Sequence, residues 1–305
     1  MITKNSAEKV GADFEAVWVS SLQVPYRAIV LVDDSDTPKT REFVKRFADA
    51  HGKELVVERS RLYGWHKPTR ATARQTAIDI FFEQFSDEWL FFLDDDFILR
   101  SGWWEEARGY VEEPRVGLVW GIDYTPRWRE RAAWVRVRGF DEVTHAIENF
   151  KVRGGLHDTL LRRRALEGVK IPPWLNVFED AWVKKYVECR GWEWRIVRTG
   201  GDHLRGEVTG GYERADFYMM AYVSAALRLE PASWRSFLGT LFGLPGYVYY
   251  SAKAYELRLA LQRGVGRWRQ RVVYRWLLLR HRRNEDPCHV VLTDSLPPPR
   301  QVAKA

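Results

Sequence analysis

Residues 89–99 read WLFFLDDDFIL, an apolar run interrupted by three adjacent aspartates. The five apolar residues 89–93 have the length and composition of a buried strand. Three neighbouring carboxylates repel one another, so ionising all three is unfavourable unless a cation lies close. Hard divalent cations prefer carboxylate oxygen as a ligand. The stretch therefore predicts a metal-binding strand end, and the alternative is a solvated acidic turn.

The segments around this stretch alternate between strand and helix patterns. The runs RAIVLVD (27–33) and ELVVERS (54–60) predict strands, and residues 37–52 and 71–85 carry apolar side chains at helical spacing. Such alternation predicts an α/β fold with a mostly parallel sheet flanked by crossover helices. Further strands are expected at 116–123 and 192–199, and further helices at 101–113, 178–191 and 215–230, whereas 124–158 has no assignable pattern.

The aspartate triplet follows the carboxyl end of its predicted strand, where open parallel sheets bind their ligands. In an extended segment Asp94 and Asp96 would point to one side and Asp95 to the other. Such a triplet can place one acid on a metal and another on a sugar or nucleotide hydroxyl.

Two further acidic pairs have the same relation to predicted elements. Asp33 and Asp34 end the strand AIVLVD, where they could accept hydrogen bonds from a nucleoside; the alternative is a turn and helix cap. Glu179 and Asp180 begin a predicted helix, where the helix dipole also favours acids for purely structural reasons. Neither pair identifies a site by itself.

Basic residues complete the set of candidates. Arg70 and Arg74 lie at the start of the predicted helix 71–85, where phosphate could bind, although a solvated basic face is the alternative. His203, in the segment TGGDHLRGE, is either a metal ligand or a structural histidine.

The order of these segments is more specific than any one of them. IVLVDDSDT, ATARQTAID, LFFLDDD and FEDAWVKKYVECRGWEWRIV together resemble the family 2 glycosyltransferases of the GT-A fold, over roughly residues 2–205. The family's first strand is represented here only by ITKN, so the first strand is expected to be truncated. Gln75 stands where the family usually has an asparagine.

The resemblance implies a metal-dependent, inverting transfer of a sugar from a nucleoside-diphosphate sugar to a hydroxyl acceptor. Asp180 would be the catalytic base beside Glu179, and Mn²⁺ or Mg²⁺ would bind Asp96 and His203. The implied contacts to the sugar nucleotide are Thr3, Asp33, Asp34, Arg70, Arg74, Asp94 and Asp95.

The carboxyl-terminal part differs in charge from the rest of the chain. Residues 231–285 contain eleven Lys/Arg and two Asp/Glu, a balance of +9, so the total of +7 leaves −2 for the remainder. Arginines there alternate with Trp268, Trp276 and aliphatic residues, as in helices that lie in a bilayer interface. The sequence contains no uninterrupted run of eighteen apolar residues, so it does not predict a simple membrane span. A helix packed on the domain with a solvated basic face is the alternative.

We therefore expect a GT-A domain over residues 1–230, a basic membrane-association segment over 231–286 and a disordered tail over 287–305. The expected location is cytoplasmic, peripheral on the inner face of the cell membrane through residues 236–283, with a lipid-linked or glycan acceptor. No nucleic-acid partner is expected, because no reading motif accompanies the basic residues. The alternative functions are a sugar-nucleotide nucleotidyltransferase and a catalytically inactive binding module for membrane or nucleic acid.

Overall fold

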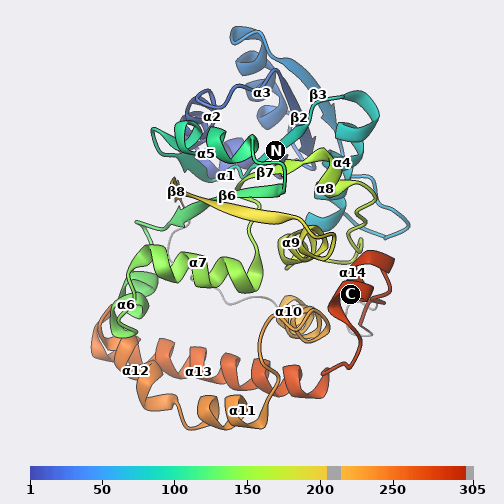
Figure 1. Cartoon of the computed structure of the whole chain (residues 1–305). Coiled ribbons are helices and arrows are strands. Elements are labelled where there is room, and N and C mark those ends of the chain that lie inside the picture. Colours follow the sequence, from blue (N-terminus) through green and yellow to red (C-terminus); the bar gives the residue numbers. More distant parts are fainter. Residues whose placement is uncertain (205–213, 300–305) are drawn as a thin grey trace. The chain divides into compact units, whose positions relative to one another are not determined.

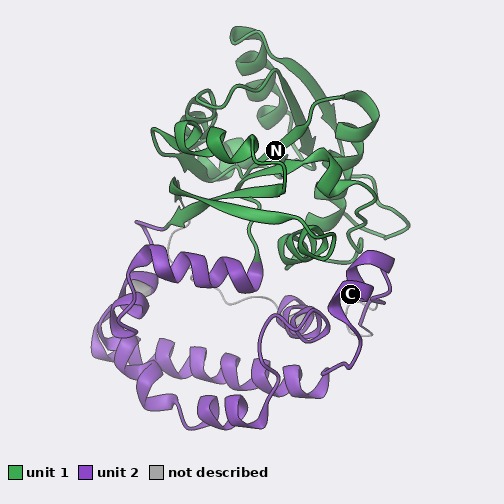
Figure 2. Ribbon diagram, in the orientation of Figure 1, with its two compact units in different colours: residues 1–124, 154–204 green, residues 125–153, 205–305 purple. Residues whose placement is uncertain are grey.

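The structure is a computed structural model that describes residues 1–204 and 214–299 (Figure 1). The chain forms two compact units: residues 1–124 with 154–204, and residues 125–153 with 205–305 (Figure 2). The expected boundary at residue 230 differs from this division. Segment 125–153 belongs to the second unit although it lies within the first in sequence, and nothing in its local pattern indicates this.

A three-stranded parallel sheet begins the first unit. Its strand order is β1 (Ile2–Thr3), β2 (Ala28–Asp33), β3 (Glu54–Glu58). The helix α3 (Lys39–Ala50) makes the predicted crossover between β2 and β3. Two helices between β1 and β2 were not expected: α1 (Ser6–Val10) and α2 (Asp13–Ser21). The parallel sheet with flanking helices confirms the predicted α/β class.

A second sheet has five strands in the order β4-β7-β6-β8-β5. Strands β6 and β8 are parallel, while β5 and β7 run antiparallel to their neighbours, so the sheet is mixed. Its strands are β4 (Trp89–Leu93), β5 (Phe97–Leu99), β6 (Val116–Tyr124), β7 (Asp158–Arg162) and β8 (Glu193–His203). The strand that precedes the aspartate triplet is therefore an edge strand of this sheet, although its apolar run is typical of a buried strand.

Helices pack against these sheets around one hydrophobic core. The remaining helices of the unit are α4 (Arg70–Gln84), α5 (Trp103–Val111), α8 (Arg163–Leu166) and α9 (Glu179–Cys189). Leu31 of β2, Phe97 of β5 and Trp103 of α5 are fully buried in this core. Burial of each side chain of this size stabilises the fold by roughly 1.5–3 kcal/mol. The core therefore stabilises the strands whose ends carry the predicted site residues.

Among the described residues of the second unit, all regular secondary structure is helical. It contains α6 (Arg129–Val137), α7 (Glu142–Arg153), α10 (Arg214–Ala226), α11 (Trp234–Leu241), α12 (Leu244–Ala252), α13 (Leu257–Arg280) and α14 (Pro287–Thr293). Helix α13 packs against α10, α11 and α12. A Cβ at Gly264 would lie 2.8 Å from the Cα of Val248, so glycine permits the close approach of α12 and α13.

The predicted basic helical segment is thus present as α11–α13. Part of the expected disordered tail is instead the helix α14, because Asp286 caps it, Pro287 suits its first turn and Val290 is buried. The last part of that predicted tail, residues 300–305, lies outside the described residues.

Candidate active site

The aspartate triplet forms the turn between β4 and β5, and each carboxylate has a different partner. Asp94 Oδ1 accepts a hydrogen bond from Arg74 Nη2 at 3.2 Å, and Asp95 accepts one from the hydroxyl of Ser6. Asp96 Oδ1 lies 3.1 Å from His203 Nε2. The predicted alternation of side chains applies to an extended strand. The chain turns here, so each carboxylate meets its own partner, while burial, with the charges of Asp96 and Asp94, raises the pKa of Asp95 to about 6.

Arg74 connects the triplet to the second acidic pair. Its Nε donates to Glu179 Oε1 at 3.2 Å and its Nη1 to the carbonyl oxygen of Leu156 at 3.4 Å, while the guanidinium also stacks 5.3 Å from the ring centroid of Phe92. The side chain is almost fully buried. The sequence predicted Arg74 as a diphosphate contact, but its nitrogens are engaged by protein acceptors. Its position makes it a link between Asp94 and Glu179.

The start of α4 is fixed by capping and docking. Thr69 and Thr72 form a capping box, in which the Thr72 amide donates to Thr69 Oγ1 at 3.1 Å. The Ala71 amide donates to the carbonyl oxygen of Leu175 at 3.1 Å, in the loop that leads to α9. These bonds place the start of α4 near Glu179 and Asp180. They also engage the amides of Ala71 and Thr72, at the helix start where we expected phosphate to bind. Arg70, at the first helical position, stays exposed.

Asp180 is a carboxyl group suited to accept a proton near neutral pH. It lies partly buried in the first turn of α9, where Oδ1 accepts a hydrogen bond from the Ala181 amide at 2.8 Å. Burial, reinforced by the neighbouring Glu179 carboxylate, raises the pKa of Asp180 to about 7. The helix begins after Phe178, whose φ of 64° is rare for an aromatic residue, and such strain is concentrated at functional sites.

Asp33 and Asp34 lie at the carboxyl end of β2 with different environments. Asp33 is fully buried; it accepts hydrogen bonds from Thr3 Oγ1 at 2.8 Å and from Ser35, and its Oδ2 lies 3.0 Å from Arg41 Nε. Asp34 is only partly buried and accepts a hydrogen bond from the Ser60 amide at 3.1 Å. Thr3 and Asp33 therefore hold the loop together, and the partly exposed Asp34 also accepts a hydrogen bond from the Ser60 hydroxyl through its second oxygen.

The predicted metal ligands Asp96 and His203 are in direct contact, at a separation that one divalent ion would also allow. Two ligands at right angles, each about 2.1 Å from an ion, are about 3 Å apart, and these two donor atoms are separated by 3.1 Å. The His203 ring meets Phe97 edge-on at 5.7 Å, and Phe97 stacks on His157 at 4.6 Å, which fixes the imidazole. Among the described residues, no group of three or more His, Cys, Asp or Glu could hold a metal. Bound phosphate and water would have to supply the other ligands.

All eleven predicted site residues lie in the first unit, and most of them form hydrogen bonds or ion pairs with one another or with a neighbouring residue. Sequence reasoning missed their supporting residues Ser6, Ser35, Arg41 and Ser60. Ser35 and Ser60 each lie two residues after the end of a strand, β2 and β3, which is a usable signal. Ser6 and Arg41 carry none, because their roles depend on how α1 and α3 pack.

An α/β fold with acids after β2 and β4, and an arginine that joins Asp94 to Glu179 at the start of α9, is the arrangement of a glycosyltransferase of the GT-A class. A family model described as glycosyl transferase family 2 matches residues 4–167, more than half of the chain. The chain therefore belongs to glycosyl transferase family 2.

Solved structures are similar in fold. The mannosyltransferase PcManGT from Pyrobaculum calidifontis, solved with GDP-Man and Mn²⁺, matches 97% of this chain and 86% of its own at 17% identity, with a TM-score of 0.52. Glucosyl-3-phosphoglycerate synthase from Mycobacterium tuberculosis matches 72% of this chain and 75% of its own at 14% identity, with a TM-score of 0.46. No curated protein sequence matches the chain.

Proposed function

We propose that the protein is a metal-dependent, inverting glycosyltransferase that moves a sugar from a nucleoside-diphosphate sugar to a hydroxyl acceptor. The observation that carries this proposal is the link from Asp94 through Arg74 to Glu179, which holds Asp180 beside the aspartate turn. In this proposal Asp180 is the general base, and the aspartate turn is the edge that binds the diphosphate.

Asp180 acts as the base in this proposal. Its pKa of about 7 lets it take a proton from an acceptor hydroxyl near neutral pH. The hydroxyl oxygen forms the new bond to the anomeric carbon as the bond to the diphosphate breaks. A single displacement of this kind inverts the anomeric configuration. Glu179 is paired with Arg74, so it positions the start of α9 and leaves proton transfer to Asp180.

The carboxylate of Asp96 and the imidazole of His203 would hold the divalent ion, which neutralises charge on the diphosphate leaving group. An imidazole ligand beside a carboxylate favours Mn²⁺ over Mg²⁺. Arg70 is the exposed cation closest in sequence to this network, and the attraction of Glu179 raises its pKa further. We assign Arg70 to the diphosphate, and Asp34 to the nucleoside, with Thr3 and Asp33 fixing the loop around it.

A screen of GDP- and UDP-sugars with Mn²⁺ tests this proposal. We expect metal-dependent binding of one donor and, with acceptor, release of the nucleoside diphosphate and a glycoside of inverted configuration by NMR. Release of pyrophosphate with a new sugar nucleotide would instead identify the nucleotidyltransferase alternative. Absence of any metal-dependent binding in calorimetry would favour the inactive binding module. Family membership and the site favour transfer.

We also propose that the second unit attaches the enzyme to an anionic membrane surface. Trp234, Leu238, Val273 and Trp276 are all more than two-fifths exposed, and the rings of Trp234 and Trp276 are in contact at 6.2 Å. We call these four residues the apolar patch. On α13 the positions 269, 273, 276 and 280 share one exposed face, so Arg269 and Arg280 flank the patch. Aromatic side chains with flanking arginines suit a bilayer interface.

Such an attachment would bring the site to a lipid-linked acceptor or a surface glycan. None of the helices in residues 1–204 and 214–299 has the length and hydropathy needed to cross a bilayer. Any attachment through these helices would therefore be peripheral. Co-sedimentation with vesicles tests it.

A further inference from the structure

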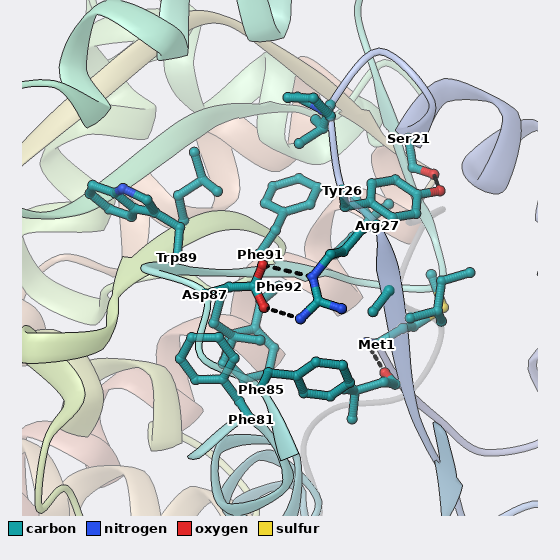
Figure 3. Close-up of a pocket in the computed structure, with 18 of the residues that line it drawn as sticks. Met1, Ser21, Tyr26, Arg27, Phe81, Phe85, Asp87, Trp89, Phe91 and Phe92 are labelled. Carbon is teal, nitrogen blue, oxygen red and sulfur yellow. Dashed lines mark hydrogen bonds and ion pairs between the residues drawn. The ribbon is translucent and has the colours of Figure 1, made fainter. Parts of the chain in front are cut away.

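The interior of the first unit contains a polar cluster beside its apolar parts. The apolar parts include a cavity of about 380 Å³ next to β4, with Phe91 and Phe92 in its wall (Figure 3). Phe91 also meets the ring of Trp103 at 5.2 Å between ring centroids. Trp103 belongs to a group of four buried residues that we call the buried polar cluster: Trp103, Trp120, His157 and Asp158.

The side chains of the buried polar cluster contact one another in a row. Trp103 Nε1 donates a hydrogen bond to Asp158 Oδ2 at 2.8 Å, and the other oxygen of Asp158 lies 2.6 Å from His157 Nδ1. Trp120 Nε1 donates to His157 Nε2 at 3.2 Å. An indole N–H can only donate. The imidazole of His157 is therefore held at both of its nitrogens, between Asp158 and Trp120.

Two glycines leave the space that this row needs. A Cβ at Gly121 would lie 1.7 Å from Asp158 Oδ2 and 2.5 Å from Trp103 Nε1. A Cβ at Gly155 would lie 2.7 Å from Trp120 Nε1. A larger residue at either position would displace a member of the cluster, so the backbone itself is fitted to the cluster.

His157 contacts the aspartate turn at both of its ends. The carbonyl oxygen of His157 accepts a hydrogen bond from the Asp94 amide at 2.8 Å, where the turn begins. Its ring stacks on Phe97, directly after the turn, at 4.6 Å with an interplanar angle of 21°. The same ring lies 5.8 Å from the ring of His203. Asp96 is next to Phe97 in the chain and 3.1 Å from His203, so the orientation of His157 bears on both predicted metal ligands.

The buried polar cluster has a cost in stability. Buried polar and ionisable side chains are unfavourable even when paired, and replacing them with apolar residues of similar volume is often neutral or stabilising. Stability of the fold therefore does not by itself explain an imidazole held between Asp158 and Trp120. A fixed orientation of the ring does explain it, because Phe97 stacks on that ring.

We propose that His157 is a positioning residue for the aspartate turn and for His203, and that the rest of the cluster fixes its ring. This role rests on the proposed function, in which Asp96 and His203 hold the divalent ion. His157 acts on the ion only through them, by its stacking on Phe97 and its carbonyl bond to Asp94. These contacts keep Asp96 Oδ1 and His203 Nε2 at a separation that one ion allows.

Trp120→Phe and His157→Phe test this role. Trp120→Phe removes the N–H that meets His157 and keeps an aromatic ring, whereas His157→Phe removes both ring nitrogens. We expect each variant to weaken Mn²⁺-dependent binding of GDP or UDP about tenfold in calorimetry. The preference for Mn²⁺ over Mg²⁺ should also fall, because a displaced His203 no longer offers its nitrogen to the ion. Loss of stability alone would leave this preference unchanged.

Thr159→Val is the matched control on the same strand, β7. The Thr159 hydroxyl donates to the carbonyl oxygen of Gly155 at 3.0 Å, so valine removes one buried hydrogen bond and leaves the four side chains of the cluster in place. It should lower the Tm and keep the metal affinity and the Mn²⁺ preference of the parent chain. An equal loss of metal affinity in Thr159→Val would overturn the proposal.

NMR of the metal-free chain gives a measurement that does not depend on transfer. The rings of Phe97 and His203 meet edge-on at 5.7 Å, and the NOEs between them should weaken at least twofold in Trp120→Phe and His157→Phe but not in Thr159→Val. Unchanged NOEs in the first two variants would overturn the proposal even if the enzyme is active. If the parent chain binds no nucleotide with Mn²⁺, the proposed function fails, and the NOEs still decide whether His157 positions His203.

Discussion

Arg74 Nε lies 3.2 Å from Glu179 Oε1, although the two residues are 105 positions apart. The same guanidinium reaches Asp94 through Nη2, so one buried cation serves two carboxylates from different elements. Ion pairs of this kind offset part of the cost of burying a charged group such as the Arg74 guanidinium. The position of α9, and of Asp180 on it, depends on this cation.

Replacing Arg74 should therefore destabilise the protein strongly. Arg74→Ala leaves Glu179 and Asp94 without their buried partner, and such losses cost about 3–5 kcal/mol. Urea unfolding measures the change. Arg100→Ala is the control, because the exposed pair of Arg100 with Asp202 should contribute less than about 1 kcal/mol. Similar losses in the two variants would show that Arg74 is not the link described above.

The role of Asp180 can be tested through pH. Transfer should rise with pH through about 7, because the base must be ionised. Asp180→Asn should reduce kcat at least 10³-fold while leaving the affinity for the sugar nucleotide within about threefold. Retained transfer in Asp180→Asn would remove this residue from the role of base.

The same raised pKa has a consequence for stability. A folded-state pKa above the unfolded one favours the protonated form, so stability declines as pH rises from about 4 to about 7. Asp180→Asn should therefore be more stable than the parent chain at pH 8, on the order of 1–2 kcal/mol for a partly buried group. At pH 4 the two should be equal. Thermal unfolding at both pH values decides the sign.

Metal binding should depend on Asp96 and His203, whose Oδ1 and Nε2 atoms are 3.1 Å apart. Asp96→Asn and His203→Gln should each weaken Mn²⁺-dependent binding of the nucleoside diphosphate at least tenfold, measured by calorimetry. Asp202→Asn is the neighbouring control, since its carboxylate pairs with Arg100. If Asp202→Asn weakens binding as much as the other two, the assignment of the metal ligands fails.

Gly154 lies close against the backbone of Asp180. Its φ is +69°, and an added Cβ would lie 2.8 Å from the carbonyl oxygen of Asp180. Gly154→Ala should lower both stability and kcat, because backbone strain and displacement of α9 act together. Gly139 has the same φ with open space around it, so Gly139→Ala should show only the cost of strain, about 1 kcal/mol. If Gly154→Ala and Gly139→Ala have comparable kcat values, Gly154 has no role in positioning Asp180.

Membrane attachment should depend on the apolar patch. Trp234→Ser with Trp276→Ser should reduce co-sedimentation with vesicles of anionic lipid at least fivefold, and added salt should weaken binding of the parent chain. Leu292→Ser, which changes a residue of similar exposure on α14, should leave binding unchanged. If the parent chain, the double variant Trp234→Ser with Trp276→Ser, and Leu292→Ser bind vesicles equally, the apolar patch is not the membrane contact.

The local patterns of the sequence were sufficient for most of the first unit. Strands β2, β3, β4, β6 and β8 and their intervening helices were expected at nearly the observed residues, because β-branched runs and helical spacing act over a few positions. Strand β7 was not expected. It is completely buried yet bounded by two charged residue types: Asp158 accepts a hydrogen bond from Trp103 Nε1 of α5 at 2.8 Å, and Arg162 pairs with Glu88 just before β4.

The sequence by itself determined which chemical groups lie at the carboxyl ends of the strands, since acids follow β2 and β4 directly. Only the tertiary structure decided which partner each acid has. The turn at Asp95 and Asp96 and the docking of α4 on the loop before α9 made Arg74 a buried link and left Asp180 with a raised pKa. These outcomes depend on burial and on contacts between residues far apart in the chain, which no local pattern contains.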